Sequence, residues 1–200
     1  MRTTLLFLIL VVATLVPAGA HAQVACLASD VSGEVALGRG PSARVKLTKY
    51  RKIVEGDLIL LMPGSRVRLT YLPMDMAEDW IGPATLRASS KGAVDEAAGT
   101  SPVVTSLGAR RLGIEDSTIL RDQRELVSGQ FRVRSASRDE PLDARGLRAL
   151  DDLRALCQHL RAVSPSGDGT AVIVYLAGLE RLGQKAEMAR ILREVSTAAP

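Results

Sequence analysis

Aromatic residues and histidine are scarce in this chain. Only 3% of its 200 residues are aromatic, and its two histidines are His21 and His159. So few rings leave little surface on which nucleic-acid bases or sugars could stack. Removal of a leader that contains His21 would leave one imidazole, which excludes catalytic and zinc sites that need two. We expect His159, beside Leu160 on a helix flank, to be a surface residue.

A large excess of charge of one sign is also missing. The chain has 26 basic and 22 acidic residues and a net charge of +4, and loss of the single charge of Arg2 with the leader would give +3. The basic residues are spread along the chain, unlike those of a nucleic-acid-binding protein. Neither a glycine-rich phosphate loop, a G-x-S-x-G elbow nor an array of metal ligands occurs. The sequence predicts no nucleic-acid partner, cofactor, metal site or catalytic residue.

An apolar run follows a positively charged start. Arg2 precedes residues 5–16, which are apolar except for one threonine, and residues 20–22 are small or polar. This pattern is typical of an export leader that is cleaved after Ala22. We therefore expect a periplasmic or secreted protein.

Two other interpretations of the same segment stay open. An uncleaved membrane anchor would need roughly twenty apolar residues, whereas this run is shorter and is broken by Pro17 and Gly19. Lipid attachment at Cys26 is the second, although Gln23 stands where an apolar residue would be expected. No later run is long enough to span a bilayer, so we do not expect the cleaved protein to span a membrane.

The chain has two cysteines, Cys26 and Cys157. In an oxidising compartment they are candidates for a disulfide that would join the N-terminal and C-terminal regions. Cys157 also falls on the apolar face of a predicted helix, so the alternative is a small buried hydrophobic residue.

Residues 23–140 show the period-two alternation of β-strands. Half-buried strands are predicted at residues 44–48, 66–71 and 130–134. Residues 58–62 are apolar throughout, which predicts a strand covered on both faces, and Pro63-Gly64 predicts a tight turn. We expect residues 58–62 and 66–72 to form a hairpin. Further predictions are a turn at 39–42, strands at 84–88 and 102–107, a surface loop at 89–101 and a strand near 118–120.

Beyond Pro141 the apolar period is helical. One predicted face carries Leu147, Leu150, Leu153, Cys157 and Leu160. Asp168 is expected to cap a second helix that ends at Leu182, where Gly183 gives a stop. The third carries Met188, Ile191, Leu192 and Val195 on one side and should form an antiparallel hairpin with the second.

These patterns predict an α+β protein with an N-terminal antiparallel β-sandwich or β-roll and a C-terminal three-helix region. The predicted divisions are a leader at 1–22, a β domain at 23–90, a linker with additional strands at 91–140 and a helical domain at 141–200.

Four turn motifs fall between residues 30 and 90: Gly33-Glu34-Val35, Gly56-Asp57-Leu58-Ile59, Gly64-Ser65-Arg66-Val67-Arg68-Leu69 and Gly82-Pro83-Ala84. In their order and spacing they resemble the FecR-like domain, a β-rich module of bacterial periplasmic proteins. Full-length regulators of that family relay signals to a cytoplasmic sigma factor through a membrane span. This chain begins with a leader instead, so the resemblance implies the β fold and not the relay.

The last two predicted helices resemble a single tetratricopeptide repeat at Leu179, Gly183, Leu192 and Pro200, but Met188 stands where that repeat prefers alanine. One repeat cannot bury a solenoid core alone. We favour a plain helical hairpin.

An acidic cluster precedes the only tryptophan: Asp75, Glu78 and Asp79 lie close to Trp80. A hydrolase would need carboxylates that face each other across a cleft, which this spacing does not establish. The alternative is an acidic loop beside a buried tryptophan.

Six basic residues fall on the polar faces of the predicted strands: Arg44, Lys46, Arg66, Arg68, Arg132 and Arg134. Adjacent strands could merge them into one positive face for an anionic partner. The alternative is a solvated sheet face whose charges discourage aggregation.

We therefore expect an exported, non-enzymatic binding or scaffold protein that acts through a FecR-like β domain. The expected partner is an envelope protein or an anionic envelope polymer. The alternatives are an envelope hydrolase with an acidic cleft around Asp75, Glu78 and Asp79, and a passive structural domain of a larger envelope assembly.

Overall fold

A computed structural model describes residues 23–38, 44–114 and 141–198. Several predictions lie outside these residues: the leader, the turn at 39–42, the strand near 118–120, and the strand at 130–134 with Arg132 and Arg134. Within the described residues, no helix combines the length and apolar character that a membrane span requires.

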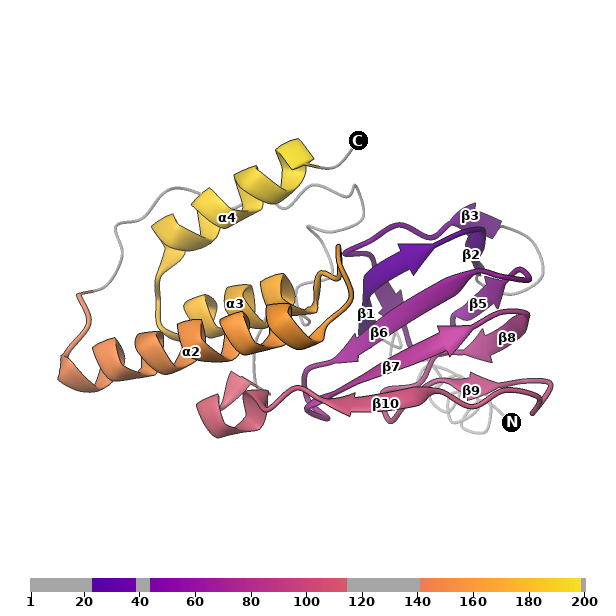
Figure 1. Cartoon of the computed structure of the whole chain (residues 1–200), viewed down its shortest axis with the longest axis horizontal. Coiled ribbons are helices and arrows are strands. Elements are labelled where there is room, and N and C mark those ends of the chain that lie inside the picture. The colour runs from indigo at the N-terminus through magenta and orange to yellow at the C-terminus, as the bar shows by residue number, and fades with distance from the viewer. Residues whose placement is uncertain (1–22, 39–43, 115–140, 199–200) are drawn as a thin grey trace, which may run out of the picture.

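Among the described residues, ten antiparallel strands form two five-stranded sheets (Figure 1). Sheet A has the order β10-β7-β6-β1-β4, and its strands are β1 (Val24–Ser32), β4 (Lys52–Val54), β6 (Arg66–Tyr71), β7 (Met76–Ile81) and β10 (Val103–Ser106). Sheet B has the order β3-β2-β5-β8-β9, and its strands are β2 (Val35–Gly38), β3 (Arg44–Lys46), β5 (Leu58–Leu61), β8 (Ala84–Arg87) and β9 (Val94–Asp95). A short 3-10 helix, η1 (Ala109–Leu112), follows β10.

The two sheets pack face to face around one apolar core. Ile59 and Leu86 enter it from sheet B, and Val67, Leu69 and Trp80 enter it from sheet A. These side chains are at most 2% exposed. Burial of each large apolar side chain contributes roughly 1.5–3 kcal/mol. The alternation of the sequence thus produces the predicted α+β fold with an N-terminal β-sandwich.

The predicted hairpin of residues 58–62 with 66–72 is wrong. β5 pairs with β2 and β8 in sheet B, whereas β6 pairs with β1 and β7 in sheet A. The chain crosses between the sheets at the turn in which the Ser65 amide donates to the Met62 carbonyl at 3.0 Å. Because β5 and β6 each carry an apolar face, placing them across the core from one another buries both faces.

In residues 141–198 the structure describes three helices: α2 (Ala144–Val163), α3 (Thr170–Arg181) and α4 (Lys185–Ala198). They lie to one side of the sheets, and α2, α3 and α4 run alternately back and forth (Figure 1). The predicted hairpin of the last two helices is present, and α3 ends close to Gly183, whose φ is 68°. Asp143 caps α2 by accepting from the Gly146 amide at 2.7 Å.

The helices cover part of the outer face of sheet A. Leu27, Leu72 and Ala77 of this face belong to a second apolar core together with side chains of α2 and α3, such as Leu153. Leu150, Cys157 and Leu160 are buried as predicted, but Leu147 is 54% exposed. The predicted apolar face therefore begins one turn later than the sequence pattern indicates.

The loop between α2 and α3 fixes this docking. The register of β1 shifts between Ala28 and Asp30, and the Ser29 carbonyl at this irregularity accepts from the Gly169 amide at 2.8 Å. The Thr170 hydroxyl donates to the Ser29 hydroxyl at 3.0 Å. A Cβ on Gly169 would lie 2.5 Å from the Tyr50 ring, so only glycine allows this approach.

Asp168, predicted to cap the second helix, takes the position before the cap. Gly169 is the N-cap residue, but the Asp168 carboxylate still accepts from the Thr170 amide at 2.9 Å and from the Thr170 hydroxyl at 2.8 Å. The predicted start of this helix is therefore correct to within one residue.

Candidate functional site

The basic residues of the strands do not form one positive face. Arg44 and Lys46 are exposed on β3, at an edge of sheet B. Arg66 and Arg68 lie on β6, in the interior of sheet A. The four described members of the predicted face are thus divided between two sheets.

Arg66 and Arg68 are also neutralised by carboxylates. Both guanidinium groups contact Asp79 of β7 at 2.6 Å, and Arg68 Nε lies 3.4 Å from a carboxylate oxygen of Asp168. The loop between α2 and α3 supplies Asp168, and Arg68 is only 5% exposed beneath it. The alternation of β6 predicts solvent exposure on its polar face, whereas the loop before α3 covers Arg68 on that face.

Asp75 has a structural role at the entry to η1. Its φ is 56°, and its carboxylate accepts from the amides of Ala109 at 2.6 Å and Arg110 at 3.2 Å. These two amides lie at the start of the 3-10 helix, where backbone donors lack intrahelical partners. Asp75 therefore holds η1 against the turn before β7.

Glu78 and Asp79 lie on a strand and not in an acidic loop, and consecutive strand residues point to opposite faces. Glu78 is 4% exposed, and one of its oxygens accepts from the Tyr71 hydroxyl, the Trp80 indole and the Ala93 amide at 3.0–3.1 Å. Burial raises the pKa of the Tyr71 hydroxyl, which remains a donor. Asp75, Glu78 and Asp79 thus bind different protein groups and do not face one another across a cleft.

Both cysteines are free thiols in this structure, and both are buried. Cys26 belongs to the core between the sheets, while Cys157 belongs to the core under the helices. The Cys157 thiol donates to the Ala171 carbonyl at 3.6 Å. Burial raises the pKa of both thiols, that of Cys157 to about 12. The candidate disulfide is absent here, and the alternative of a small buried residue matches the geometry.

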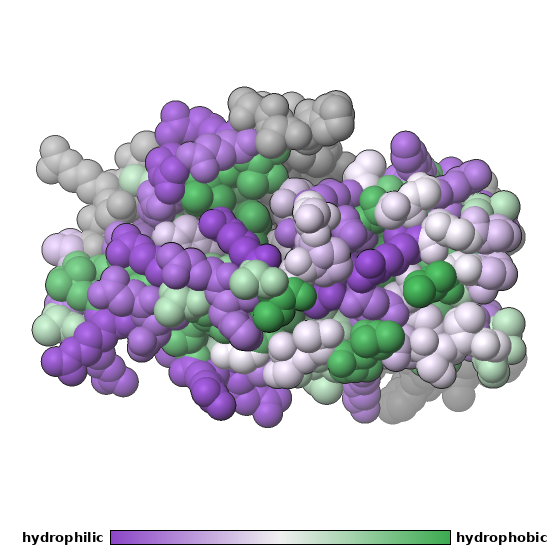
Figure 2. Space-filling model, in the orientation of Figure 1, coloured by the Kyte–Doolittle hydropathy of each residue, from purple (hydrophilic) through white to green (hydrophobic). Residues whose placement is uncertain are grey.

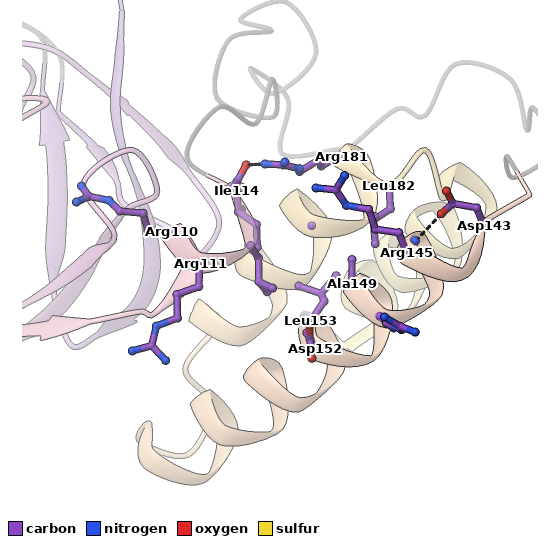
Figure 3. A pocket seen from close by; sticks show the side chains of 15 residues that line it. Arg110, Arg111, Ile114, Asp143, Arg145, Ala149, Asp152, Leu153, Arg181 and Leu182 are labelled. Carbon is purple, nitrogen blue, oxygen red and sulfur yellow. Dashed lines mark hydrogen bonds between the residues drawn. The ribbon is translucent and has the colours of Figure 1, made fainter.

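Elsewhere, a pocket of about 660 Å³ opens where η1 meets α2 and α3 (Figure 3). Side chains from all three elements line it: Arg110, Arg111, Leu112, Ile114, Asp143, Arg145, Arg148, Ala149, Asp152, Leu153, Arg181 and Leu182. Five arginines against two aspartates leave three positive charges around one cavity. On the side shown in Figure 2, the helical half exposes many hydrophilic residues with hydrophobic ones between them.

Glycines shape the walls of this arginine-lined pocket. Gly113 has a φ of 63°, and a Cβ there would overlap the guanidinium group of Arg181. Because Gly113 has no Cβ, the Arg181 guanidinium group can approach and donate to the Gly113 carbonyl. This hydrogen bond ties α3 to the segment after η1. A Cβ on Gly178 of α3 would lie 2.5 Å from the side chain of Leu153, which is 1% exposed at the floor.

Arg145 and Arg148 lie near the amino end of α2, where the helix dipole does not favour a cation. Both lie in the first two turns of α2, and its first turn contains no acidic residue. The amino end of a helix carries partial positive charge, so a cation in the first turn, such as Arg145, costs about 0.3–1 kcal/mol, whereas the N-cap carboxylate of Asp143 acts in the opposite direction. Both side chains are exposed, and no described residue forms an ion pair with either. Their positive charge is therefore available to a ligand.

Sequence reasoning missed this pocket because its arginines come from three separate segments and follow no common period. The available signals were the adjacent Arg110 and Arg111 and the basic start of α2. These two signals indicate a common basic site only once η1 is known to lie beside α2.

No protein-family model matches this chain, and neither a curated protein nor a solved structure shows significant similarity to it.

Proposed function

We propose that this chain is an exported, non-enzymatic binding protein that holds an anionic envelope partner at the arginine-lined pocket. The observation that carries the proposal is that Arg145, in the first turn of α2, and Arg148, in the second, line the pocket without an ion-pair partner among the described residues. A local arrangement that opposes helix stability is expected where function requires it.

The chemistry of the pocket favours anion binding. A guanidinium group can donate two parallel hydrogen bonds to a carboxylate or phosphate, and such charge-assisted bonds are stronger than neutral ones. Within the described part of the chain, the lining contains no hydroxyl, thiol or imidazole side chain. This composition supports binding over nucleophilic catalysis.

The FecR-like character of the β domain is part of the same proposal. Its support is local: Gly56 has a φ of 82°, and Asp57 in the same turn accepts from the Val54 amide at 3.0 Å. In this proposal the β domain is the rigid support that presents η1, through the contact with Asp75, to the helices.

Export is proposed from the leader alone. Amino-terminal sequencing of protein from the periplasmic fraction is expected to begin at Gln23. An intact Met1 in the cytosolic fraction would contradict export without bearing on the pocket.

Binding can be tested with two probes, poly-L-glutamate and polyphosphate, by calorimetry on the chain beginning at Gln23. The double variant Arg145→Gln/Arg148→Gln is expected to bind at least one probe about tenfold more weakly than the parent chain, because charge-assisted bonds are lost. Removing cations from the amino end of α2 should not lower its melting temperature, so weaker binding would not reflect unfolding.

The matched control is Arg44→Gln/Lys46→Gln, which removes the same charge from exposed positions on β3. It is expected to retain the parent affinity. Equal losses of affinity in both double variants would show that net charge drives binding and would refute the pocket as the site. Failure of both probes to bind the parent chain would refute it as well.

A further inference from the structure

The floor of the arginine-lined pocket is apolar, which narrows the class of partner. Leu112, Ala149 and Leu182 line the cavity and are each partly exposed, and Ile114 and Leu153 close it beneath them. A polymer of phosphates or sugars has no group that gains from contact with such a floor. A bulky apolar side chain does gain, because contact removes apolar surface on both molecules from water.

The cations stand on both sides of this floor. Arg110 and Arg111 come from η1, while Arg145 and Arg181 come from the helices, and Ile114, Ala149 and Leu153 lie between the two groups (Figure 3). The side chains of Arg110 and Arg111 extend outward from this floor, so they can reach a ligand at the rim of the pocket (Figure 3). A ligand that reaches both sides must therefore carry negative charge on each side of an apolar centre. The volume of about 660 Å³ is larger than a single carboxylate or phosphate requires and falls in the range of sites for larger organic groups.

Two carboxylates also line the pocket, and they oppose a uniformly charged polymer. Asp152 is exposed on α2, and Asp143, at the amino end of the same helix, adds a second negative charge to the lining. These carboxylates would repel the phosphates of a polyphosphate chain. A polypeptide offers backbone N–H groups, which donate hydrogen bonds to carboxylates.

Resting on the proposed function, we infer that the partner presents an acidic polypeptide segment with one bulky apolar side chain at its centre. The apolar side chain occupies the floor over Ala149. Acidic residues on either side of it pair with the arginines of η1 and of α2.

The test compares three probes of similar charge. The first is a five-residue capped peptide with phenylalanine at its centre and two acidic residues on each side, the second has alanine at its centre, and the third is a short polyphosphate. Calorimetry on the parent chain is expected to give a dissociation constant at least about tenfold lower for the phenylalanine peptide than for either other probe, since the anchor adds buried apolar area.

A variant that fills the floor tests the placement. Ala149→Leu adds apolar volume at the lining without changing charge, and it is expected to weaken the phenylalanine peptide about tenfold while leaving the alanine peptide unchanged. Ala155→Leu is the control, since Ala155 is exposed on the same helix and does not line the pocket. It is expected to bind all probes as the parent does.

The outcomes separate the two proposals. If both peptides bind equally and only Arg145→Gln/Arg148→Gln weakens them, the anionic site stands and the apolar anchor is refuted. Tighter binding of polyphosphate than of the phenylalanine peptide overturns the polypeptide inference in favour of a polymer. Failure of all three probes overturns this inference together with the proposed function.

Discussion

Arg68 offers the sharpest test of how the helical layer is held to the β-sandwich. Its guanidinium group lies 2.6 Å from Asp79 and 3.4 Å from Asp168, and its side chain is 6% exposed. Arg68→Met keeps most of the aliphatic volume and removes the charge. Asp79 retains Arg66, whereas the fully buried side chain of Asp168 loses its only ion-pair partner among the described residues.

The expected loss of stability in Arg68→Met follows from the fact that Asp168, unlike Asp79, is left without a cation in the part of the chain that the structure describes. Removing one partner of a buried ion pair leaves an uncompensated charge and typically costs about 3–5 kcal/mol. Arg66→Met is the matched control, because Arg66 is 37% exposed and Asp79 keeps Arg68. An exposed pair is worth about 0–1 kcal/mol. The two variants should therefore differ in free energy of unfolding by about 3 kcal/mol.

Urea unfolding followed by the fluorescence of Trp80 provides the assay, since this single tryptophan is 2% exposed in the core between the sheets. Circular dichroism reports the helices independently. The double variant Arg68→Met/Asp168→Asn removes both charges, and the new amide side chain retains an oxygen that can accept from the Thr170 amide. We expect it to be more stable than Arg68→Met alone by at least about 2 kcal/mol.

Equal losses in Arg66→Met and Arg68→Met would refute this reasoning. So would a double variant as unstable as Arg68→Met, because the coupling between the two charges would then be absent.

Three further predictions concern packing and the thiols. Gly178→Ala should lose about 1–3 kcal/mol of stability despite alanine's better helix propensity, because its Cβ would collide with Leu153, whereas Gly99→Ala, whose Cβ would meet only Asp95 at 3.9 Å, should change thermal stability little. Cys26 and Cys157 should resist a thiol-specific reagent in the native protein and both react in denaturant; no reaction in denaturant would show a disulfide instead. Burial raises the pKa of Cys157 from 9.0 to about 12, so the unfolded chain releases this proton first and stability should fall as pH rises above 9.0. The fall should be less steep in Cys157→Ala by about 1.4 kcal/mol per pH unit, and identical pH profiles would contradict this account.

Local patterns in the sequence predicted most of the elements. The helical period beyond Pro141 predicts α2 because it reflects burial of one face of that helix. The alternation of residues 66–71 predicts a strand correctly, although the structure buries both faces of β6. The stop at Gly183 was likewise predictable, since a left-handed residue there ends α3 without help from distant residues.

Long-range pairing was not predictable from the same patterns. A tight turn at Pro63-Gly64 fits a hairpin as well as a crossing between sheets, and only the pairing of β5 with β2 and β8 decides between them. The partners of Arg68 were hidden for a related reason. An arginine on an alternating strand is indistinguishable from a solvent-facing one until Asp168, one hundred residues later, covers it.

β1 belongs to both halves of the molecule at once. Cys26 and Ala28 point into the core between the sheets, while Leu27 and Ser29 meet the helical layer. A single-residue insertion in this strand would exchange these two sets, turning Leu27 into the core between the sheets and withdrawing Ser29 from Thr170. A chain shortened to end at Ile114 would instead leave Leu27, Leu72 and Ala77 bare to water. The strand that closes the core of the sandwich therefore also completes the core of the helical layer, and neither part can be removed without exposing apolar surface of the other.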